Sequence, residues 1–204
     1  MIKALITDFG GVLMRTRTDG SRRALEQQLS LAPRTLDDRV FSCEMSQQAM
    51  RGDISETALW HYLESDLDLA QHGLTWQEFQ RRFFEEDFLD EDLMDFIRGT
   101  RPALKTGLIS NAWDGLREVL HTRAPIADAF DVIVISAEEK IMKPDPRIYL
   151  GTLERLAVKA EEAIFLDDFI ENIHAANALG MHGVHFRSTE QAQSEIHALL
   201  DGSR

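Results

Sequence analysis

Four separate places in the chain carry side chains that could together transfer a phosphoryl group, namely Asp8, the pair Ser110-Asn111, Lys143 and the pair Asp167-Asp168. A carboxylate can attack phosphorus, while a lysine and a divalent cation neutralise the phosphoryl oxygens. A hydroxyl beside free backbone amides can orient the phosphoryl group for in-line transfer. These residue types are the ones that an aspartyl-phosphate mechanism requires, in which water finally hydrolyses the acyl phosphate.

The elements that must position these residues are short apolar segments, and most of the residues lie at or just beyond the end of one. Buried strands are predicted at 2–7, 104–109, 132–135, 163–166 and 183–186. Helices are predicted between them, from 112, from 146, over 170–179, and after the capping pair Ser188 and Gln191. Such alternation is typical of a parallel α/β sheet that is covered on both faces. The carboxyl ends of its strands meet at one edge, where ligands bind.

A different pattern occupies residues 15–99, where apolar residues recur at three- and four-residue spacings and no strand pattern is evident. The spacing predicts helices at 22–29, 36–50, 56–67, 75–86 and 91–98. We therefore expect an α/β core made of 1–14 and 100–204 with an α-helical second domain, 15–99, inserted after the first strand. Aromatic and leucine stripes in this region are interpreted as bundle core. The acidic run at 85–92 is interpreted as a solvated turn.

Each candidate residue also has an ordinary structural interpretation. Asp8 could cap a turn, and Ser110 could begin a helix, with Asp114 shortly after it. Lys143 lies in a loop stiffened by two prolines, yet it could be a solvated surface lysine. Asp167-Asp168 is harder to explain in this way, because two uncompensated charges beside a buried strand are costly. A hard divalent cation is their natural compensation.

The composition limits the class of partner. The chain of 204 residues has a formal net charge of −13 and no basic stripe, which argues against nucleic acid. Its apolar stretches are too short to cross a membrane, and its first residues do not resemble a signal peptide. The single cysteine, Cys43, fits a reducing compartment. We expect a cytoplasmic protein with no membrane partner, and a small phosphorylated substrate remains compatible with the charge.

Four short motifs in a fixed order carry a resemblance to a known family. They are Asp8-Phe9-Gly10-Gly11-Val12-Leu13, Leu108-Ile109-Ser110-Asn111, Lys143-Pro144-Asp145-Pro146-Arg147-Ile148-Tyr149, and Phe165-Leu166-Asp167-Asp168 with Asn172 beyond it. Each motif is weak alone, but the set and its order are specific. The chain resembles the haloacid dehalogenase-like (HAD) hydrolase superfamily over nearly its whole length.

The resemblance implies a Rossmann-like doubly wound core, a helical cap domain and dependence on Mg²⁺. By analogy with the family, Asp8 is the nucleophile and a metal ligand, and Asp168 is a further ligand. Phosphate binding is assigned to Ser110, Asn111 and Lys143, of which Lys143 is also catalytic. Asp167 would be a second acidic ligand or would act through water, and the backbone carbonyl of Gly10 would complete the metal site.

One position departs from the family pattern. Phosphatases of the family usually carry an aspartate two residues after the nucleophile, where this chain has Gly10. Loss of such a general acid and base typically costs ~10²–10⁴-fold in rate. The variant motif resembles a subgroup that includes sugar-1-phosphate phosphatases and the phosphatase domains of epoxide hydrolases, and a good leaving group would reduce the need for an acid.

Three functions fit these features. The first is a Mg²⁺-dependent phosphatase of a small metabolite, with sugar phosphates as candidate substrates. The second is a 2-haloacid dehalogenase, which uses the same aspartate on carbon without metal; the pair Asp167-Asp168 argues against it. The third is a non-catalytic binding or regulatory protein that lost turnover with the change at Gly10.

Overall fold

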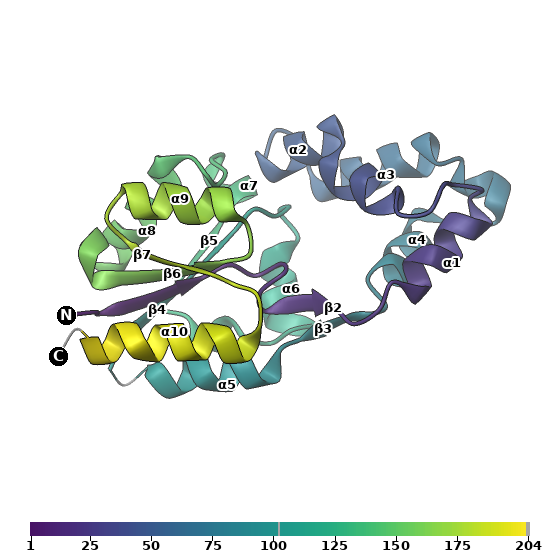
Figure 1. The fold of residues 1–204 in the computed structure, drawn as a ribbon. Coiled ribbons are helices and arrows are strands. Elements are labelled where there is room, and N and C mark those ends of the chain that lie inside the picture. Colours follow the sequence, from purple (N-terminus) through teal and green to yellow (C-terminus); the bar gives the residue numbers. More distant parts are fainter. Residues whose placement is uncertain (102, 203–204) are drawn as a thin grey trace.

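A five-stranded parallel sheet forms the centre of the protein (Figure 1). In this computed structural model, residues 1–101 and 103–202 are described. The strand order is β5-β4-β1-β6-β7, and each neighbouring pair is parallel. The strands are β1 (Ala4–Thr7), β4 (Lys105–Ser110), β5 (Val132–Ile135), β6 (Ala163–Asp167) and β7 (His182–His185). All five predicted strands are therefore present, each within two residues of its expected bounds.

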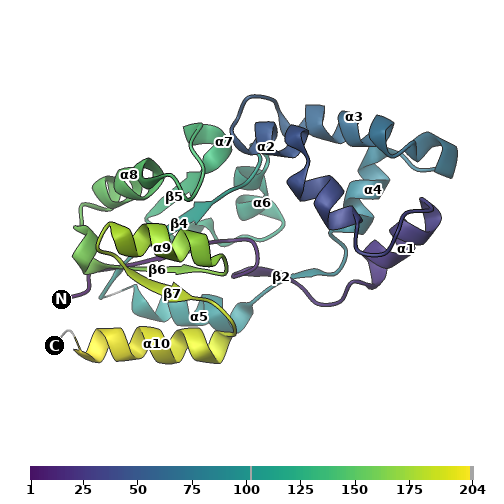
Figure 2. The same ribbon diagram turned by 45° about the horizontal axis from the view of Figure 1, so that its top comes forward.

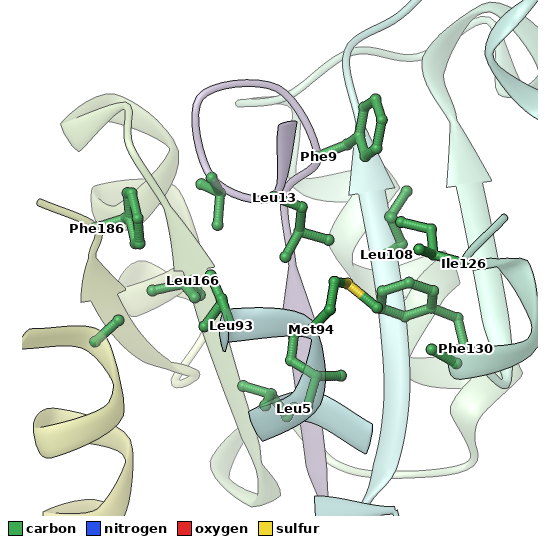
Figure 3. Packing of buried hydrophobic residues seen from close by; sticks show 14 of the residues in the cluster. Leu5, Phe9, Leu13, Leu93, Met94, Leu108, Ile126, Phe130, Leu166 and Phe186 are labelled. Atoms are coloured by element: carbon green, nitrogen blue, oxygen red, sulfur yellow. The ribbon is translucent and has the colours of Figure 1, made fainter. Parts of the chain in front are cut away.

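Helices cover both faces of this sheet, as the alternating pattern predicted (Figures 1 and 2). One face packs on α8 (Pro146–Leu156) and α9 (Ile170–Ala178), whose apolar side chains share a cluster with β-strand residues such as Ile6 and Phe165. The opposite face packs mainly on α5 (Glu91–Thr100) and α10 (Thr189–Gly202). Figure 3 shows Leu93 and Met94 of α5 packed among residues of the sheet on that side. Throughout the described residues, no helix combines the length and hydropathy needed to cross a bilayer.

The connection after β4 differs from the prediction. A helix was expected from residue 112, with Ser110 near its start, but α6 begins later and spans Leu116–Thr122. Its N-cap residue is Gly115, and Ser110 is the last residue of β4. Ser110 is therefore not a helix cap, and residues 111–115 form a loop at the edge of the sheet. The short helix α7 (Ser136–Glu139) follows β5.

The helices α1 to α4, which we call the helical insertion, lie together beside the sheet (Figure 2). Their apolar side chains form a cluster separate from those of the sheet, joined by Trp113. They span Gly20–Gln28, Glu44–Met50, Glu56–Asp66 and Trp76–Phe83, and short turns of π- and 3₁₀-helix occupy Asp38–Ser42 and Leu69–His72. The expected stripes are buried, with Leu59, Leu63, Phe79 and Phe83 fully so. The helix predicted over 36–50 is broken, because Cys43 is extended and its sulfur accepts a hydrogen bond from Ser46 N at the start of α2.

Two short strands that were not predicted link the insertion to the sheet. Strands β2 (Met14–Thr16) and β3 (Asp87–Leu89) pair in an antiparallel ribbon. Arg22 in α1 lies 3.0 Å from the carboxylate of Asp87, which also accepts a hydrogen bond from Thr16. Part of the acidic run is therefore not a solvated turn, and it pairs with the arginines where the chain enters the insertion. Segments of three residues are too short for a periodic strand signal.

Helix α5 follows β3 and packs with the core rather than with the helical insertion. Its Leu93, Met94 and Ile97 are buried in the same cluster as Leu5 and Leu108 of the sheet. Predicting this helix was correct, but the expected placement of residues 91–99 in the second domain was wrong. The division of the chain into two folding units stays a proposal, with the boundary moved to the β2-β3 ribbon.

The start of α5 depends on Asp90, and we predict that Asp90→Ala destabilises the protein. Asp90 is 5% exposed; its carboxylate caps Leu93 N and also accepts hydrogen bonds from Arg15 and Thr189. Loss of the cap and of hydrogen bonds to a charged group should lower the free energy of unfolding by about 2–4 kcal/mol. Urea denaturation measures this value. The exposed Asp92→Ala is the control, and an equally small loss in both variants would refute the structural role of Asp90.

Candidate active site

The predicted site residues do meet at one edge of the sheet. Strand β1 lies between β4 and β6, with Thr7 level with Leu108 and Leu166. Asp8 follows directly, and its backbone N–H donates to the Leu166 carbonyl at 2.8 Å. Asp8 is therefore flanked by the ends of β4 and β6, which carry Ser110 and Asp167.

Lys143 lies at the centre of this edge and is buried, with 1% of its side chain exposed. Its Nζ atom lies 2.8 Å from Asp8 Oδ1 and 2.6 Å from Asp167 Oδ2, and it donates to the Ile109 carbonyl at 3.0 Å. These three acceptors match the three protons of an ammonium group. The interpretation of Lys143 as a solvated surface lysine is therefore wrong.

Asn111 holds the backbone of Lys143 in place. Its Nδ2 donates to the Lys143 carbonyl at 2.9 Å, and its Oδ1 accepts from the Lys143 N–H at 2.8 Å. Both ends of the side-chain amide are therefore occupied. The sequence predicted that Asn111 binds phosphate, whereas the structure uses its side chain to position the lysine.

Asp167 is surrounded by donors from the protein itself. Besides Lys143, the Asn172 side chain donates to both of its oxygens, at 3.0 and 3.1 Å, and Phe169 N donates at 2.8 Å. The Asp167 side chain is fully buried. Since both oxygens already accept hydrogen bonds, Asp167 is the least available of the acidic residues for a direct metal bond.

Asp168 has the opposite character. Its Oδ1 is buried and accepts no hydrogen bond from any residue in the described part of the chain. Gly11, with φ of +77°, brings its backbone against this carboxylate, since a Cβ at Gly11 would lie 2.2 Å from Asp168 Oδ2. Glycine is therefore favoured at position 11 for two reasons: it adopts the left-handed backbone conformation, and it lets the Asp168 carboxylate approach the backbone closely.

The charges of the site fit a divalent cation. Asp8, Asp167 and Asp168 offer oxygen atoms that lie within 4.8 Å of one another. Burial raises the pKa of Asp8 to about 7 against the opposing effect of Lys143, and burial followed by the charge of Asp167 raises the pKa of Asp168. Three carboxylates thus share one ammonium group. An oxygen-rich, electron-rich cluster with an unsatisfied carboxylate suits a hard ion such as Mg²⁺.

Two further groups at the edge are free to meet a substrate. Ser110 is buried, and none of the described residues hydrogen-bonds to its hydroxyl. Gly10 is exposed, and no atom lies within 4 Å of a Cβ built on it. The absence of a side chain at Gly10 is therefore not forced by packing around a Cβ.

Sequence patterning missed Trp113, which joins the loop after Ser110 to the helical insertion. Trp113 is buried in the cluster of the insertion, stacks on Phe41 with ring centroids 5.8 Å apart, and donates to Ser46 Oγ, 67 residues away in the chain. The next residue, Asp114, accepts a hydrogen bond from Glu56 N at the start of α3. The only available signal was a tryptophan in a segment between a strand and a helix.

Comparison with known proteins identifies the family. The model of the haloacid dehalogenase-like hydrolases matches residues 2–180, a range that includes the helical insertion and the four strand ends of the site. The chain belongs to this family. It is thus a HAD-like hydrolase, and the fold class predicted from the sequence is confirmed.

Two relatives of this HAD-like hydrolase match along nearly their whole length. A sesquiterpene phosphatase of Aspergillus oryzae is 29% identical over 97% of this chain and 96% of the relative. A D-ribitol-5-phosphate phosphatase of Bacteroides thetaiotaomicron is 27% identical over 98% of this chain and 100% of the relative. A mouse acyl-CoA dehydrogenase family member 10 is 48% identical over 71 residues, but these cover only 7% of that longer protein.

A solved structure has the same fold. A HAD family enzyme from Bacteroides thetaiotaomicron, in complex with magnesium and inorganic phosphate, superposes with a TM-score of 0.73 at 20% identity, over 92% of this chain and 95% of that one. The likeness establishes the fold of this HAD-like hydrolase along both the sheet and the helical insertion.

Proposed function

We propose that this HAD-like hydrolase is a Mg²⁺-dependent phosphatase of a small phosphorylated metabolite that works through an aspartyl-phosphate intermediate on Asp8. The observation that carries the proposal is the group of one lysine and three carboxylates at the sheet edge, in which Asp8, Asp167 and Lys143 are buried, Asp168 is half-buried, and Asp168 Oδ1 lacks a donor from the described residues. The phosphatase names of the two full-length relatives support it. Sugar phosphates remain candidate substrates, and the cytoplasmic location and the absence of nucleic-acid and membrane partners stay predictions.

The contacts of Asp8 support its role as the nucleophile, because they leave one carboxylate oxygen without a donor. Its Oδ1 accepts hydrogen bonds from Phe9 N at 2.7 Å and from Lys143 Nζ at 2.8 Å, whereas none of the described residues donates to Oδ2. Oδ2 is therefore the oxygen that attacks phosphorus, and the leaving oxygen takes the electron pair of the broken bond. The Ser110 hydroxyl donates to a phosphoryl oxygen, and Lys143 neutralises another. Water then attacks phosphorus and returns the electron pair to Asp8.

Asp8, Asp168 and the backbone carbonyl of Gly10 would hold the Mg²⁺ ion. Asp167, whose oxygens are engaged by the protein, would support the ion indirectly by fixing Lys143 and the end of β6. When bound, Mg²⁺ supplies the positive charge that lowers the repulsion between the attacking carboxylate and the phosphoryl oxygens.

The proposal is tested by phosphate release from a panel of sugar, polyol, aryl and isoprenoid phosphates, with Mg²⁺ and with EDTA. We expect release that depends on Mg²⁺ for at least one class of ester. Metal-independent halide release from a 2-haloacid would instead identify a dehalogenase. Inactivity against both panels would favour the binding protein.

The metal site gives a separate prediction for Gly11. Gly11→Ala should weaken Mg²⁺ binding by about 10–100-fold, because the new methyl group would displace Asp168 from its position. Isothermal titration with Mg²⁺, and the Mg²⁺-induced rise in melting temperature, measure the effect. Gly10→Ala is the matched control, since its methyl group would meet no atom within 4 Å. Equal Mg²⁺ affinity in both variants would contradict the metal assignment.

A further inference from the structure

Phe169 breaks two local rules beside the catalytic carboxylates. It occupies the N-cap position of α9, where a polar side chain is favoured, and it makes no side-chain capping bond. Phe169 is 61% exposed, and the following Ile170 is 39% exposed. The missing cap costs stability, and the exposed ring contributes no burial that offsets this cost. Residues that violate local rules without a structural gain are expected at functional sites.

The position of Phe169 is fixed by the site itself. Its backbone N–H donates to Asp167 Oδ1 at 2.8 Å, so the backbone of Phe169 directly contacts the charged group of the site. The preceding residue, Asp168, has its side chain against Gly11, so Phe169 directly follows a residue that contacts the Gly10-Gly11 turn. Of the exposed large apolar residues in the described chain, Phe169 and Ile170 are the two that are consecutive and that adjoin the carboxylates.

The lack of an acidic side chain at Gly10 independently restricts the kind of leaving group that the site can release. No acidic side chain stands at this position, while Asp8, Asp167 and Asp168 are committed to attack, to Lys143 and to the cation. A leaving oxygen that can depart without a proton from these groups therefore fits the site best. An aryl oxygen can do so, because a phenol with a pKa of about 10 is a far stronger acid than an aliphatic alcohol.

We propose that the substrate is an aryl phosphate whose ring binds against Phe169 and Ile170. This inference rests on the proposed phosphatase function. Asp8 Oδ2 forms a bond to phosphorus, and the bond from phosphorus to the aryl oxygen breaks with its electron pair on that oxygen. The aryloxide leaves as an anion and takes its proton from solvent. Water then attacks phosphorus, its proton passes to solvent, and the Asp8 carboxylate is restored.

The test compares three phosphate esters on the full chain with Mg²⁺: 1-naphthyl phosphate, cyclohexylmethyl phosphate and D-ribitol 5-phosphate. We expect kcat/KM to be highest for naphthyl phosphate. Phe169→Ser should lower that value about tenfold, mainly through KM, because it removes a large apolar contact. The same variant should lower kcat/KM for ribitol phosphate far less than it lowers kcat/KM for naphthyl phosphate. Because serine is a favoured N-cap residue, the melting temperature should rise by about 2–4 °C, which excludes misfolding as the cause.

Two further variants complete the experiment. Leu150→Ser replaces a 49% exposed apolar residue on α8. It should leave kcat/KM unchanged for both naphthyl phosphate and ribitol phosphate. Gly10→Asp should raise kcat for the two alkyl esters at least about tenfold and have little effect on naphthyl phosphate, since a restored acid helps only poor leaving groups. Equal losses for naphthyl and ribitol phosphate in Phe169→Ser, or ribitol phosphate as the best wild-type substrate, would overturn the inference alone. Absence of Mg²⁺-dependent phosphate release from all esters would overturn the proposed function as well.

Discussion

Asp8→Asn is expected to abolish turnover while leaving the fold intact. The amide cannot form an acyl phosphate, and loss of a nucleophile typically lowers kcat by about 10⁴–10⁶-fold. The side chain keeps its shape, and an asparagine oxygen can still accept from Phe9 N and Lys143 Nζ. Because burial raises the pKa of Asp8 to about 7, ionising this carboxyl costs free energy in the folded state, so its removal should not lower stability.

Phosphate release and thermal unfolding measure the two halves of this prediction. The control is Asp92→Asn, which makes the same chemical change at an exposed position in the first turn of α5. More than about 1% of the wild-type rate in Asp8→Asn, after contaminating phosphatases have been excluded, would remove Asp8 from the role of nucleophile.

Lys143→Met is expected to reduce both activity and stability. The variant removes the ammonium group that lies between Asp8 and Asp167, and it leaves two buried carboxylates without compensation. Breaking a buried pair in this way typically costs about 3–5 kcal/mol of unfolding free energy. Losing an electrostatic group that stabilises the transition state should lower kcat by about 10²–10³-fold.

The stability loss in Lys143→Met should depend on pH. Without the lysine, the folded state raises the pKa of Asp8 further above its unfolded value, so between these two values the folded protein binds more protons than the unfolded protein. The free energy of unfolding then falls as pH rises through this range. The difference in this free energy between wild type and Lys143→Met should be larger at pH 8 than at pH 5. Urea unfolding in EDTA at both pH values measures it.

The control for this variant is Lys159→Met, whose lysine side chain is 75% exposed and lies 3.8 Å from Glu161. It should change stability by less than about 0.5 kcal/mol at either pH. A Lys143→Met protein as stable as this control would contradict the assignment of Lys143 as the group that compensates the two buried carboxylates.

The parts of the fold that were predictable from sequence are those that a local pattern specifies. Residues 4–6 and 163–166 are apolar on both faces, and such runs are typical of buried parallel strands. The convergence of Asp8, Ser110 and Asp167 then follows from strand direction alone. The three-residue strands β2 and β3 carry no such periodic signal, because only their pairing defines them.

The partners of individual site residues were not predictable, because they are set by tertiary contacts. Asn111 and Asp167 looked equivalent to the other polar residues at the strand ends. In the structure, however, the side chains of both are engaged in hydrogen bonds with other protein groups. Trp113 acquired its role from Phe41 and Ser46, which lie in the helical insertion. Local sequence identifies which residues can do chemistry, and packing decides which of them remain free to do so.

The central claim, that Asp8 carries the phosphoryl group during turnover, can be tested by trapping the intermediate. Wild-type protein with Mg²⁺ and 1-naphthyl phosphate would be quenched in acid during the steady state, reduced with borohydride and digested for mass spectrometry. Reduction converts an aspartyl phosphate to homoserine, and we expect this conversion at residue 8 alone, absent with EDTA. Turnover without modified residue 8, or with the modification on another residue, would contradict the account.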